Sequence, residues 1–386
     1  MRYRDVIEAV GNTPLVRLDT GDERVEVYAK LELQNLYGMK DRVARQAILA
    51  ARDSGELAPG APIVESSSGT MALGVALVGT RLGHPVHIVT DPRIDRLTLA
   101  KLRALGCVVD VVPKMTAQGW QSARLERLAE LMRELPGAFW PRQYTNPENP
   151  RAYRALAVEL LADLDRFDVL VGSVGSGGSL CGTAGALRRA LPDLWVVAVD
   201  AVGSVLFGQP DRPQRLQAGL GNSLLPANVD YTLIDEVHWL NDREAFTGTR
   251  ELAAEQAIFA GNSSGSVYRV LRFLQRHASP GTRLVGILPD RGDRYAGTVY
   301  DNAYWREKNL SASDRRDQPR EVAPGTVVSA WSYTACRAGR PFCVQSDDLH
   351  RVQHDRDRDA GAAPGLGAGV PSGAMHRTAG AVPGPA

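Results

Sequence analysis

The sequence predicts an α/β protein in which helices cover both faces of parallel sheets. From residue 25 to about residue 287, short apolar runs alternate with segments whose apolar residues recur at helical spacing. One break, near residues 136–150, divides this alternation into two series. Strand–helix alternation of such length is typical of parallel sheets packed between helices. We therefore expect two lobes with a cleft between them, where ligands bind beyond the C-terminal ends of the strands.

The first series can be assigned element by element from its periodicity. Residues 25–31 alternate between apolar and polar and predict a strand, whereas the apolar spacing of residues 42–54 predicts a helix. The same criteria predict, in order, a strand at 62–65, a helix rich in small residues at 69–82, a strand at 86–90, a helix at 95–105 and a strand at 108–112.

The second series repeats the pattern and then gives way to a different kind of sequence. Beyond about residue 305 the periodicity ends, and Gly, Ala and Pro make up 19 of the 28 residues at 359–386. Such a segment cannot bury enough apolar surface to offset its ordering entropy, so we expect a disordered tail there. Residues 306–358 form an extension of unknown role, part of which could pack on the main body. The predicted elements of this series are a helix at 151–164, a strand at 167–172, a helix at 182–191, a strand at 194–200, helices at 244–259 and 266–277, and a strand at 282–288.

Composition excludes several classes of function. The 386 residues carry a net charge of +1, so no electrostatic field favours nucleic acid or an acidic membrane. No apolar run reaches the roughly 18 residues of a membrane helix, and no apolar signal core follows the N-terminus, which predicts a cytoplasmic protein. The four cysteines and seven histidines show no metal-ligand spacing, so no metal is expected. Cys336 and Cys343 could pair, but a reducing cytoplasm favours free thiols.

Lys40 is the most informative single residue. Of the 45 basic side chains only five are lysine, and arginine cannot replace lysine as a Schiff-base former or an amine base. Burial lowers the pKa of a lysine and permits both roles. Composition alone favours a surface lysine at the start of a helix. The motifs elsewhere in the chain favour a chemical role.

Two glycine- or serine-rich turns each connect a predicted strand to a predicted helix. The turn at 175–179, GSGGS, would expose backbone N–H groups at a helix N-terminus, which suits a single phosphate. A tight turn without a ligand is the alternative. Leu180 stands where a dinucleotide fingerprint needs glycine, which excludes a dinucleotide dehydrogenase. The turn at 66–70, SSSGT, suits a carboxylate, although one serine would suffice as an ordinary N-cap.

Taken in their order along the chain, these features resemble the fold-type II pyridoxal-phosphate enzymes, and most closely the cysteine synthase and cystathionine β-synthase family. The resemblance covers roughly residues 5–300 and excludes the tail. It implies the two-lobed fold of the tryptophan synthase β type, with pyridoxal 5'-phosphate as cofactor. The matching segments are GNTPLV at 11–16, KDR at 40–42, NPENP at 146–150, the turn at 175–179, GLG at 219–221 and LPDRGDRY at 288–295.

The resemblance assigns roles to individual positions. Lys40 would be the catalytic residue and would bind the cofactor as a Schiff base. A neutral hydroxyl at Ser263, facing the pyridine nitrogen, would leave the ring poorly protonated and favour β-elimination over transamination. The other residues implied to bind the cofactor are Thr70, Gly175, Ser176, Gly177, Gly178 and Ser179. Those implied to bind the substrate are Ser67, Ser68, Gly69, Thr70, Met71, Gln143 and Gly219.

The resemblance also divides the chain and gives it an oligomeric state. Residues 1–40 and 146–305 would form a large cofactor-binding lobe, and residues 41–145 a small mobile lobe that binds substrate. Because most members of the family are homodimers, a homodimer is expected. The remaining partners would be a small amino-acid substrate and a small nucleophile, with no nucleic acid and no membrane.

Departures from the family pattern concern the substrate. The family has Ser-Gly-Asn-Thr-Gly where this chain continues from Ser68-Gly69 with Thr70, Met71 and Ala72, and Gly38 replaces the usual serine two residues before the lysine. Thr70 is shorter than the asparagine that contacts the cofactor ring and senses substrate. These changes resemble the S-sulfocysteine synthase-like branch of actinobacterial cysteine synthases.

The implied activity is β-replacement on an activated L-serine, either O-phosphoserine or O-acetylserine, with sulfide or thiosulfate as nucleophile. A phosphoserine user would need a basic residue near the leaving group, for which Arg212 and Arg215 are candidates. One alternative is a specialised synthase that makes a diaminopropionate-like amino acid. Others are a serine or threonine dehydratase, and a non-catalytic relative that binds a cofactor or a partner.

Overall fold

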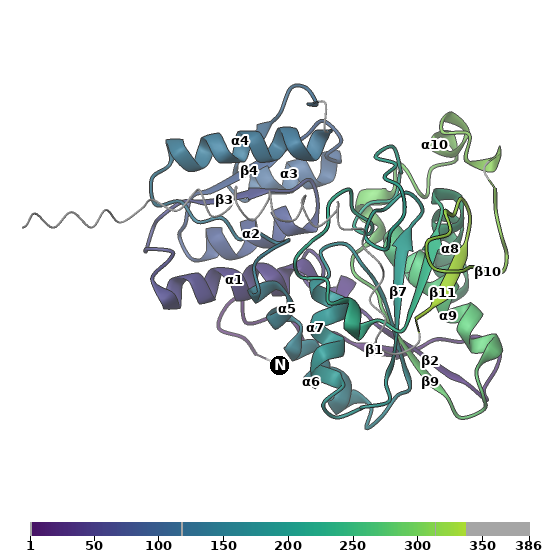
Figure 1. Cartoon of the computed structure of the whole chain (residues 1–386). Coiled ribbons are helices and arrows are strands. Elements are labelled where there is room, and N and C mark those ends of the chain that lie inside the picture. The colour runs from purple at the N-terminus through teal and green to yellow at the C-terminus, as the bar shows by residue number, and fades with distance from the viewer. Residues whose placement is uncertain (1, 117–118, 313, 337–386) are drawn as a thin grey trace, which may run out of the picture.

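The chain forms two sheets, each with its own helices, in a computed structural model that describes residues 2–116, 119–312 and 314–336 (Figure 1). The larger sheet has the strand order β1-β2-β9-β6-β7-β8-β11-β10. Its strands are β1 (Leu15–Arg17), β2 (Glu26–Lys30), β6 (Val169–Ser173), β7 (Trp195–Ala201), β8 (Glu236–Leu240), β9 (Arg283–Ile287), β10 (Arg320–Glu321) and β11 (Ser332–Ala335).

The smaller sheet lies beside the larger one and contains the strands of the first series except the one at 25–31, which is β2 of the larger sheet. Its order is β3-β4-β5, with β3 at Ile63–Ser66, β4 at Val86–Thr90 and β5 at Val108–Val111. Figure 1 shows this sheet among α1 to α4, whereas α5 to α9 accompany the larger sheet. The helices are α1 (Lys40–Ser54), α2 (Thr70–Arg81), α3 (Arg96–Ala104), α4 (Trp120–Glu134), α5 (Glu148–Ala152), α6 (Arg154–Asp163), α7 (Gly178–Leu187), α8 (Asp242–Gln256), α9 (Asn262–His277) and α10 (Asn302–Glu307).

The predicted parallel architecture is confirmed. All pairs of the smaller sheet are parallel, and so are the central pairs of the larger sheet from β2 through β9, β6 and β7 to β8. Antiparallel pairing occurs where β1 joins β2 and where β11 joins β8. Parallel strands buried on both faces are apolar along their length, which is why their positions could be predicted.

Several elements differ from their predicted bounds. Helices α7 and α9 begin at Gly178 and Asn262, four residues before the predicted starts at 182 and 266, because glycine and serine form their first turns without any apolar periodicity. The predicted helix at 151–164 is two helices that meet at Tyr153. Strands β1, β8, β10 and β11 and helices α4 and α10 were not predicted. In β8, buried Glu236 and His238 interrupt the apolar pattern.

The cysteines behave as expected where they are described. Cys107 and Cys181 are buried free thiols, and burial raises the pKa of Cys107 to about 11. Cys336 is also free, whereas Cys343 and the predicted tail at 359–386 lie outside the described residues.

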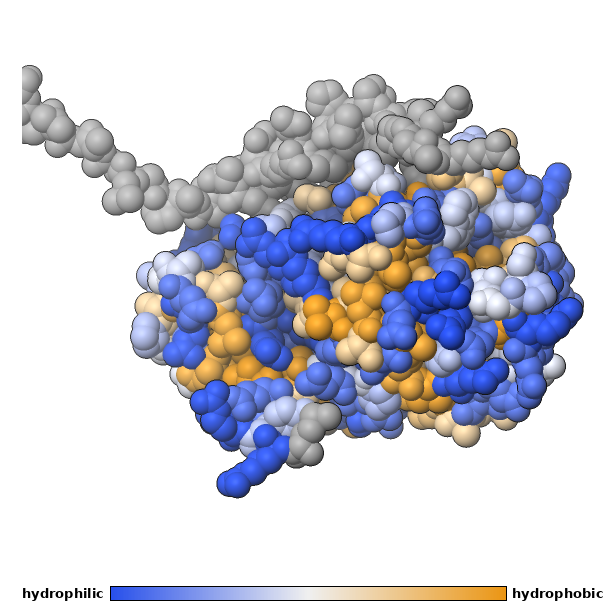
Figure 2. Space-filling view, turned by 90° about the horizontal axis from the view of Figure 1, so that it is seen from below, coloured by the Kyte–Doolittle hydropathy of each residue, from blue (hydrophilic) through white to orange (hydrophobic). Residues whose placement is uncertain are grey.

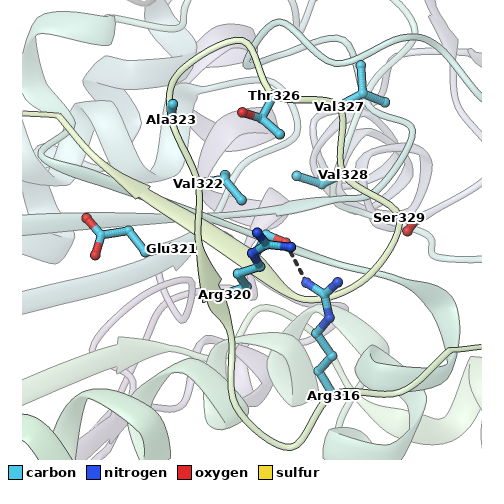
Figure 3. A pocket seen from close by; sticks show the side chains of 10 residues that line it. Arg316, Arg320, Glu321, Val322, Ala323, Thr326, Val327, Val328 and Ser329 are labelled. Atoms are coloured by element: carbon cyan, nitrogen blue, oxygen red, sulfur yellow. Dashed lines mark hydrogen bonds between the residues drawn. The ribbon is translucent and has the colours of Figure 1, made fainter.

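The extension after residue 305 packs on the large sheet as far as it is described. Strand β11 pairs with β8, and Trp331, which is 1% exposed, donates its backbone N–H to Glu244 of α8. Figure 3 shows the loop between β10 and β11, beside which Arg316 donates a hydrogen bond to Ser332 Oγ at 3.1 Å. The extension is therefore part of the folded body up to residue 336.

Gln209 connects this extension to the loop that precedes Gly219. Its side chain donates to Thr326 O at 2.8 Å and accepts from Val328 N at 2.9 Å, and it is 5% exposed. We expect Gln209→Ala to lower the free energy of unfolding by about 1–2 kcal/mol, since the buried N–H of Val328 and the carbonyl of Thr326 both lose their partner. Urea denaturation would measure this, with the exposed Gln318→Ala as control. Equal midpoints for both variants would contradict the assignment.

Candidate active site

Lys40 is the first residue of α1. The two residues that precede it, Gly38 and Met39, contact the segment that follows β9. Met39 N donates to Pro289 O at 2.9 Å, and Gly38 has φ +129°, a conformation that favours glycine. Lys40 remains partly accessible, but the surrounding protein lowers the pKa of its amine to about 8, an effect that nearby Asp290 opposes. An accessible lysine with a lowered pKa can act as a nucleophile or a base.

The predicted phosphate turn lies between β6 and α7. Gly177 has φ +81°, and α7 begins at the next residue, so its first N–H groups are oriented away from the helix body. Packing also requires glycine here. A Cβ on Gly177 would lie 2.7 Å from Asn228 O, and one on Gly178 would lie 2.0 Å from Asn149 Oδ1. The turn is thus tightly packed rather than an open loop.

The loops around Gln143 and Gly219 meet this turn. Asn149 donates to Ser176 Oγ at 3.0 Å and to Gln143 O at 2.6 Å. A Cβ on Gly175 would lie 3.0 Å from Gly219 O. The structure therefore brings together segments that are far apart in the sequence and that were predicted separately.

Ser67 and Ser68 follow β3 at the start of α2 and lie beside two arginines. Ser67 Oγ accepts the N–H of Gly69 at 3.2 Å, which is ordinary turn capping. Arg124 Nη1 donates to Ser68 Oγ at 3.3 Å, and Arg294 Nη2 donates to Ser68 O at 3.4 Å. The turn thus combines hydroxyl donors with two guanidinium groups, a set suited to a carboxylate or a phosphate.

Arg124 was missed because helix α4 was not predicted. Arg124 is 9% exposed, and its Nη1 lies 3.4 Å from Asp91 Oδ2. Within the described residues its Nε has no hydrogen-bond partner. Glu65, at the same end of β3, is 1% exposed, and burial raises its pKa to about 8, so that this carboxyl group is largely neutral at pH 7. Asp91, which also pairs with Arg93, is therefore the carboxylate that partners Arg124, rather than Glu65. A search for helical periodicity over residues 120–134 would have revealed helix α4, and with it the position of Arg124 on the buried face.

Ser263 and Ser264 lie in the first turn of α9. Ser263 is 2% exposed, and the buried hydroxyl of Ser264 has no hydrogen-bond partner among the described residues. The preceding Asn262 exchanges hydrogen bonds with Ala218 N and O, at 3.3 and 3.0 Å. These bonds join α9 to the loop that carries Gly219.

The positions that depart from the family pattern contact one another. A Cβ on Gly38 would lie 3.3 Å from Thr70 Cγ2 and 3.1 Å from Pro289 O. The absence of a side chain at Gly38 therefore leaves room for the methyl group of Thr70. Met71 is 2% exposed and belongs to the hydrophobic core, so its side chain is not free at the turn.

The two candidate leaving-group arginines lie in the loop before Gly219. Arg215 donates to Gly203 O at 2.8 Å and to Ser223 Oγ at 3.2 Å, so it braces this loop. Arg212 is exposed, and its side-chain carbons pack beside Gly203. No group of His, Cys, Asp and Glu residues suited to a metal occurs in the described part of the chain.

Lys40 is expected to react with an amine-directed reagent much more readily than an ordinary lysine. Only the neutral amine reacts, so its labelling should rise through about pH 8 in protein without bound ligand. Lys308 is the control, because its hydrogen bond to Glu307 raises its pKa. Peptide mass spectrometry after brief acetylation at several pH values would measure both. Parallel curves for the two lysines would contradict the assignment.

Comparison with known proteins identifies relatives along most of the chain. A family model described as "Pyridoxal-phosphate dependent enzyme" matches residues 6–290. N-(2-amino-2-carboxyethyl)-L-glutamate synthase of Cupriavidus metallidurans is 40% identical over 339 residues, which cover 85% of this chain and 98% of the relative. A putative cysteine synthase of Sinorhizobium fredii is 35% identical over 322 residues, with coverages of 80% and 94%.

Solved structures show the same likeness. The crystal structure of O-ureido-L-serine synthase aligns with a TM-score of 0.72 and 31% identity, covering 80% of this chain and 100% of that one. An O-acetylserine dependent cystathionine β-synthase from Helicobacter pylori aligns with a TM-score of 0.71 and 29% identity, with coverages of 77% and 98%. No helix among the described residues is long and apolar enough to cross a membrane.

Proposed function

Because the chain belongs to the pyridoxal-phosphate dependent enzymes, within the cysteine synthase and cystathionine β-synthase family, we propose that it joins an activated L-serine to an amino-acid nucleophile such as L-glutamate. The coarse activity follows from the family: the chain is a β-replacement enzyme that acts on a serine derivative and uses pyridoxal 5'-phosphate. The proposal concerns the nucleophile.

The residues present fit the cofactor. Lys40 offers an accessible amine of lowered pKa, and the turn at 175–179 presents the start of α7 for the phosphate group. Buried Ser264 Oγ and Asn149 Oδ1 have no hydrogen-bond partners among the described residues, as expected for polar groups that bind a cofactor. Thr70 and Ser263 would complete the set. When bound, pyridoxal phosphate withdraws electrons from the substrate Cα and so makes its proton acidic.

The residues of the chain supply the other parts of the reaction. Lys40 would hold the cofactor covalently and, once displaced by substrate, its amine would take the Cα proton as general base. Ser67, Ser68, Gly69 and the Gln143 loop would orient the substrate carboxylate, with Gly219 on the opposite side. Met71 would contribute only by supporting the turn from the core.

The observation that carries the choice of nucleophile is Arg124 at the carboxylate turn. Its guanidinium group touches Ser68 and retains an unpartnered Nε among the described residues. A sulfide ion needs no such group, whereas an amino-acid nucleophile brings carboxylates that must be bound and neutralised. The 40% identity to a synthase whose product contains glutamate favours the same chemistry.

Product analysis would test this proposal directly. Purified enzyme with pyridoxal phosphate is offered O-phosphoserine or O-acetylserine, each with L-glutamate, sulfide or thiosulfate, and products are identified by mass spectrometry. We expect N-(2-amino-2-carboxyethyl)-L-glutamate, and the better serine donor reveals the leaving group. Cysteine formation from sulfide with a far higher kcat/KM than glutamate would instead establish the sulfur-using synthase, which the 35% identical putative cysteine synthase supports.

Arg124→Leu tests the residue that carries the proposal. We expect kcat/KM for the glutamate reaction to fall about 10–100-fold, the loss of one charge-assisted contact, while any reaction with sulfide changes much less. Arg127→Leu is a matched control on the same helix, since that arginine pairs with Asp110, Glu130 and Glu134 away from the turn. An equal loss with both nucleophiles would show that Arg124 only supports the turn.

We also propose a homodimer. Figure 2 shows apolar side chains gathered on one face of the molecule, interrupted by charged ones. Large apolar side chains exposed in the described part of the chain include Val158 and Trp195, at 67% and 37%, and exposed apolar surface is typical of protein interfaces. Sedimentation equilibrium would measure the mass, and a monomer at micromolar concentration would contradict the proposal.

A further inference from the structure

Asp290 lies against the segment that leads to Lys40. It follows β9, and its neighbour Pro289 accepts the N–H of Met39 at 2.9 Å. A Cβ on Gly38 would lie 3.3 Å from Asp290 Cβ, and one on Gly261 would lie 2.2 Å from Asp290 Oδ1. Because Gly38 and Gly261 have no side chains, the Asp290 side chain fits between them.

The carboxylate of Asp290 is only half satisfied. The residue is 6% exposed, and its Oδ2 accepts the Tyr295 hydroxyl at 2.8 Å. Its Oδ1 has no hydrogen-bond partner among the described residues. A buried carboxylate oxygen without a partner is costly, so a group that binds it at some stage of the reaction is expected.

Lys40 directly follows the Gly38–Met39 segment against which Asp290 packs, which makes its amine the candidate for that group. Arg294 Nη1 lies 3.9 Å from Oδ2, which leaves Oδ1 free, and Asp95 adds a like charge. Burial raises the pKa of Asp290, while Arg294, the Tyr295 hydrogen bond and Lys40 lower it. Asp290 is in turn the charged group that raises the pKa of Lys40 against the effect of burial.

We propose that Asp290 is a positioning residue that holds the Lys40 ammonium group through Oδ1 whenever Lys40 carries the proton taken from the substrate. This inference rests on the proposed role of Lys40 as general base. The proton moves from the substrate Cα to Lys40 Nζ and creates a positive charge within the protein, and Asp290 provides the counter-charge. The aspartate itself contacts neither substrate nor cofactor in this role.

Neutral variants of Asp290 test the pairing. In the full-length chain after removal of cofactor, Asp290→Asn is expected to label at Lys40 about tenfold faster than wild type at pH 7, because the amine loses its counter-charge. In the holoenzyme, kcat is expected to fall about tenfold with little change in KM, and the acid limb of the pH–rate profile moves to lower pH.

Controls separate the pairing from a structural role. Asp41→Asn neutralises a different buried carboxylate next to Lys40 in sequence, and it should leave Lys40 labelling as in wild type. Circular dichroism checks folding, and Asp290→Ser replaces Asp290→Asn if the latter does not fold. Wild-type labelling of Lys40 in a folded neutral variant overturns the proposal. Labelling does not depend on the nucleophile, so failure of the glutamate reaction is a separate result.

Discussion

Lys40→Ala is expected to abolish turnover, with kcat reduced about 10³-fold or more, because it would remove both the proposed covalent attachment and the proposed general base. The same variant should lose the visible absorbance of lysine-bound pyridoxal phosphate while still folding, since Lys40 is only partly buried. Absorbance spectra and single-turnover kinetics with saturating cofactor measure the two effects.

Lys308→Ala is the matched control, because Lys308 is exposed and interacts with its neighbours Glu307 and Tyr304. It should keep both the absorbance and the rate of wild type. Retention of the lysine-bound absorbance in Lys40→Ala would show that another amine binds the cofactor. It would contradict the proposal that Lys40 holds the cofactor covalently.

Gly177→Ala is expected to disrupt the phosphate turn. A side chain at φ +81° is strained, and its Cβ would lie 2.7 Å from Asn228 O and from both Val229 N and Val229 Cγ2. Together these effects should lower the free energy of unfolding by about 2–4 kcal/mol and weaken cofactor binding. Denaturant unfolding of the cofactor-free protein and cofactor titration measure the two losses.

Gly297→Ala provides the comparison for this substitution. Gly297 has an ordinary backbone conformation and no atom within 4 Å of a built Cβ, so the same change should have little effect there. Wild-type stability and cofactor affinity in Gly177→Ala would contradict both the tight packing of the turn and its proposed role in binding the cofactor phosphate.

Sequence reasoning predicted the positions of most parallel strands along the chain because most are short apolar runs bounded by turn residues. It failed where charge interrupts the run. In β8, His238 contacts both Glu236 and the Trp331 indole, so its polar groups are paired inside the protein. That pairing depends on a residue 93 positions away, which no local pattern contains.

Some residues of the candidate site could likewise be predicted from the sequence, and others could not. Lys40 and the turn at 175–179 were found from local signals: a rare lysine and a glycine-rich strand–helix junction. Arg124 and Asp290 gave no such signal, because one arginine in a charged helix and one aspartate after a strand resemble many surface residues. Their relevance appears only from what they contact.

The sequence by itself determined the strand–helix alternation, the family resemblance and the identity of Lys40 as the candidate base, since each depends on short-range order along the chain. Only the tertiary structure placed Arg124 on Ser68 and Asp290 behind Gly38, because these contacts join residues more than 50 positions apart. The sequence therefore indicates the class of chemistry, and long-range packing decides which charges surround it.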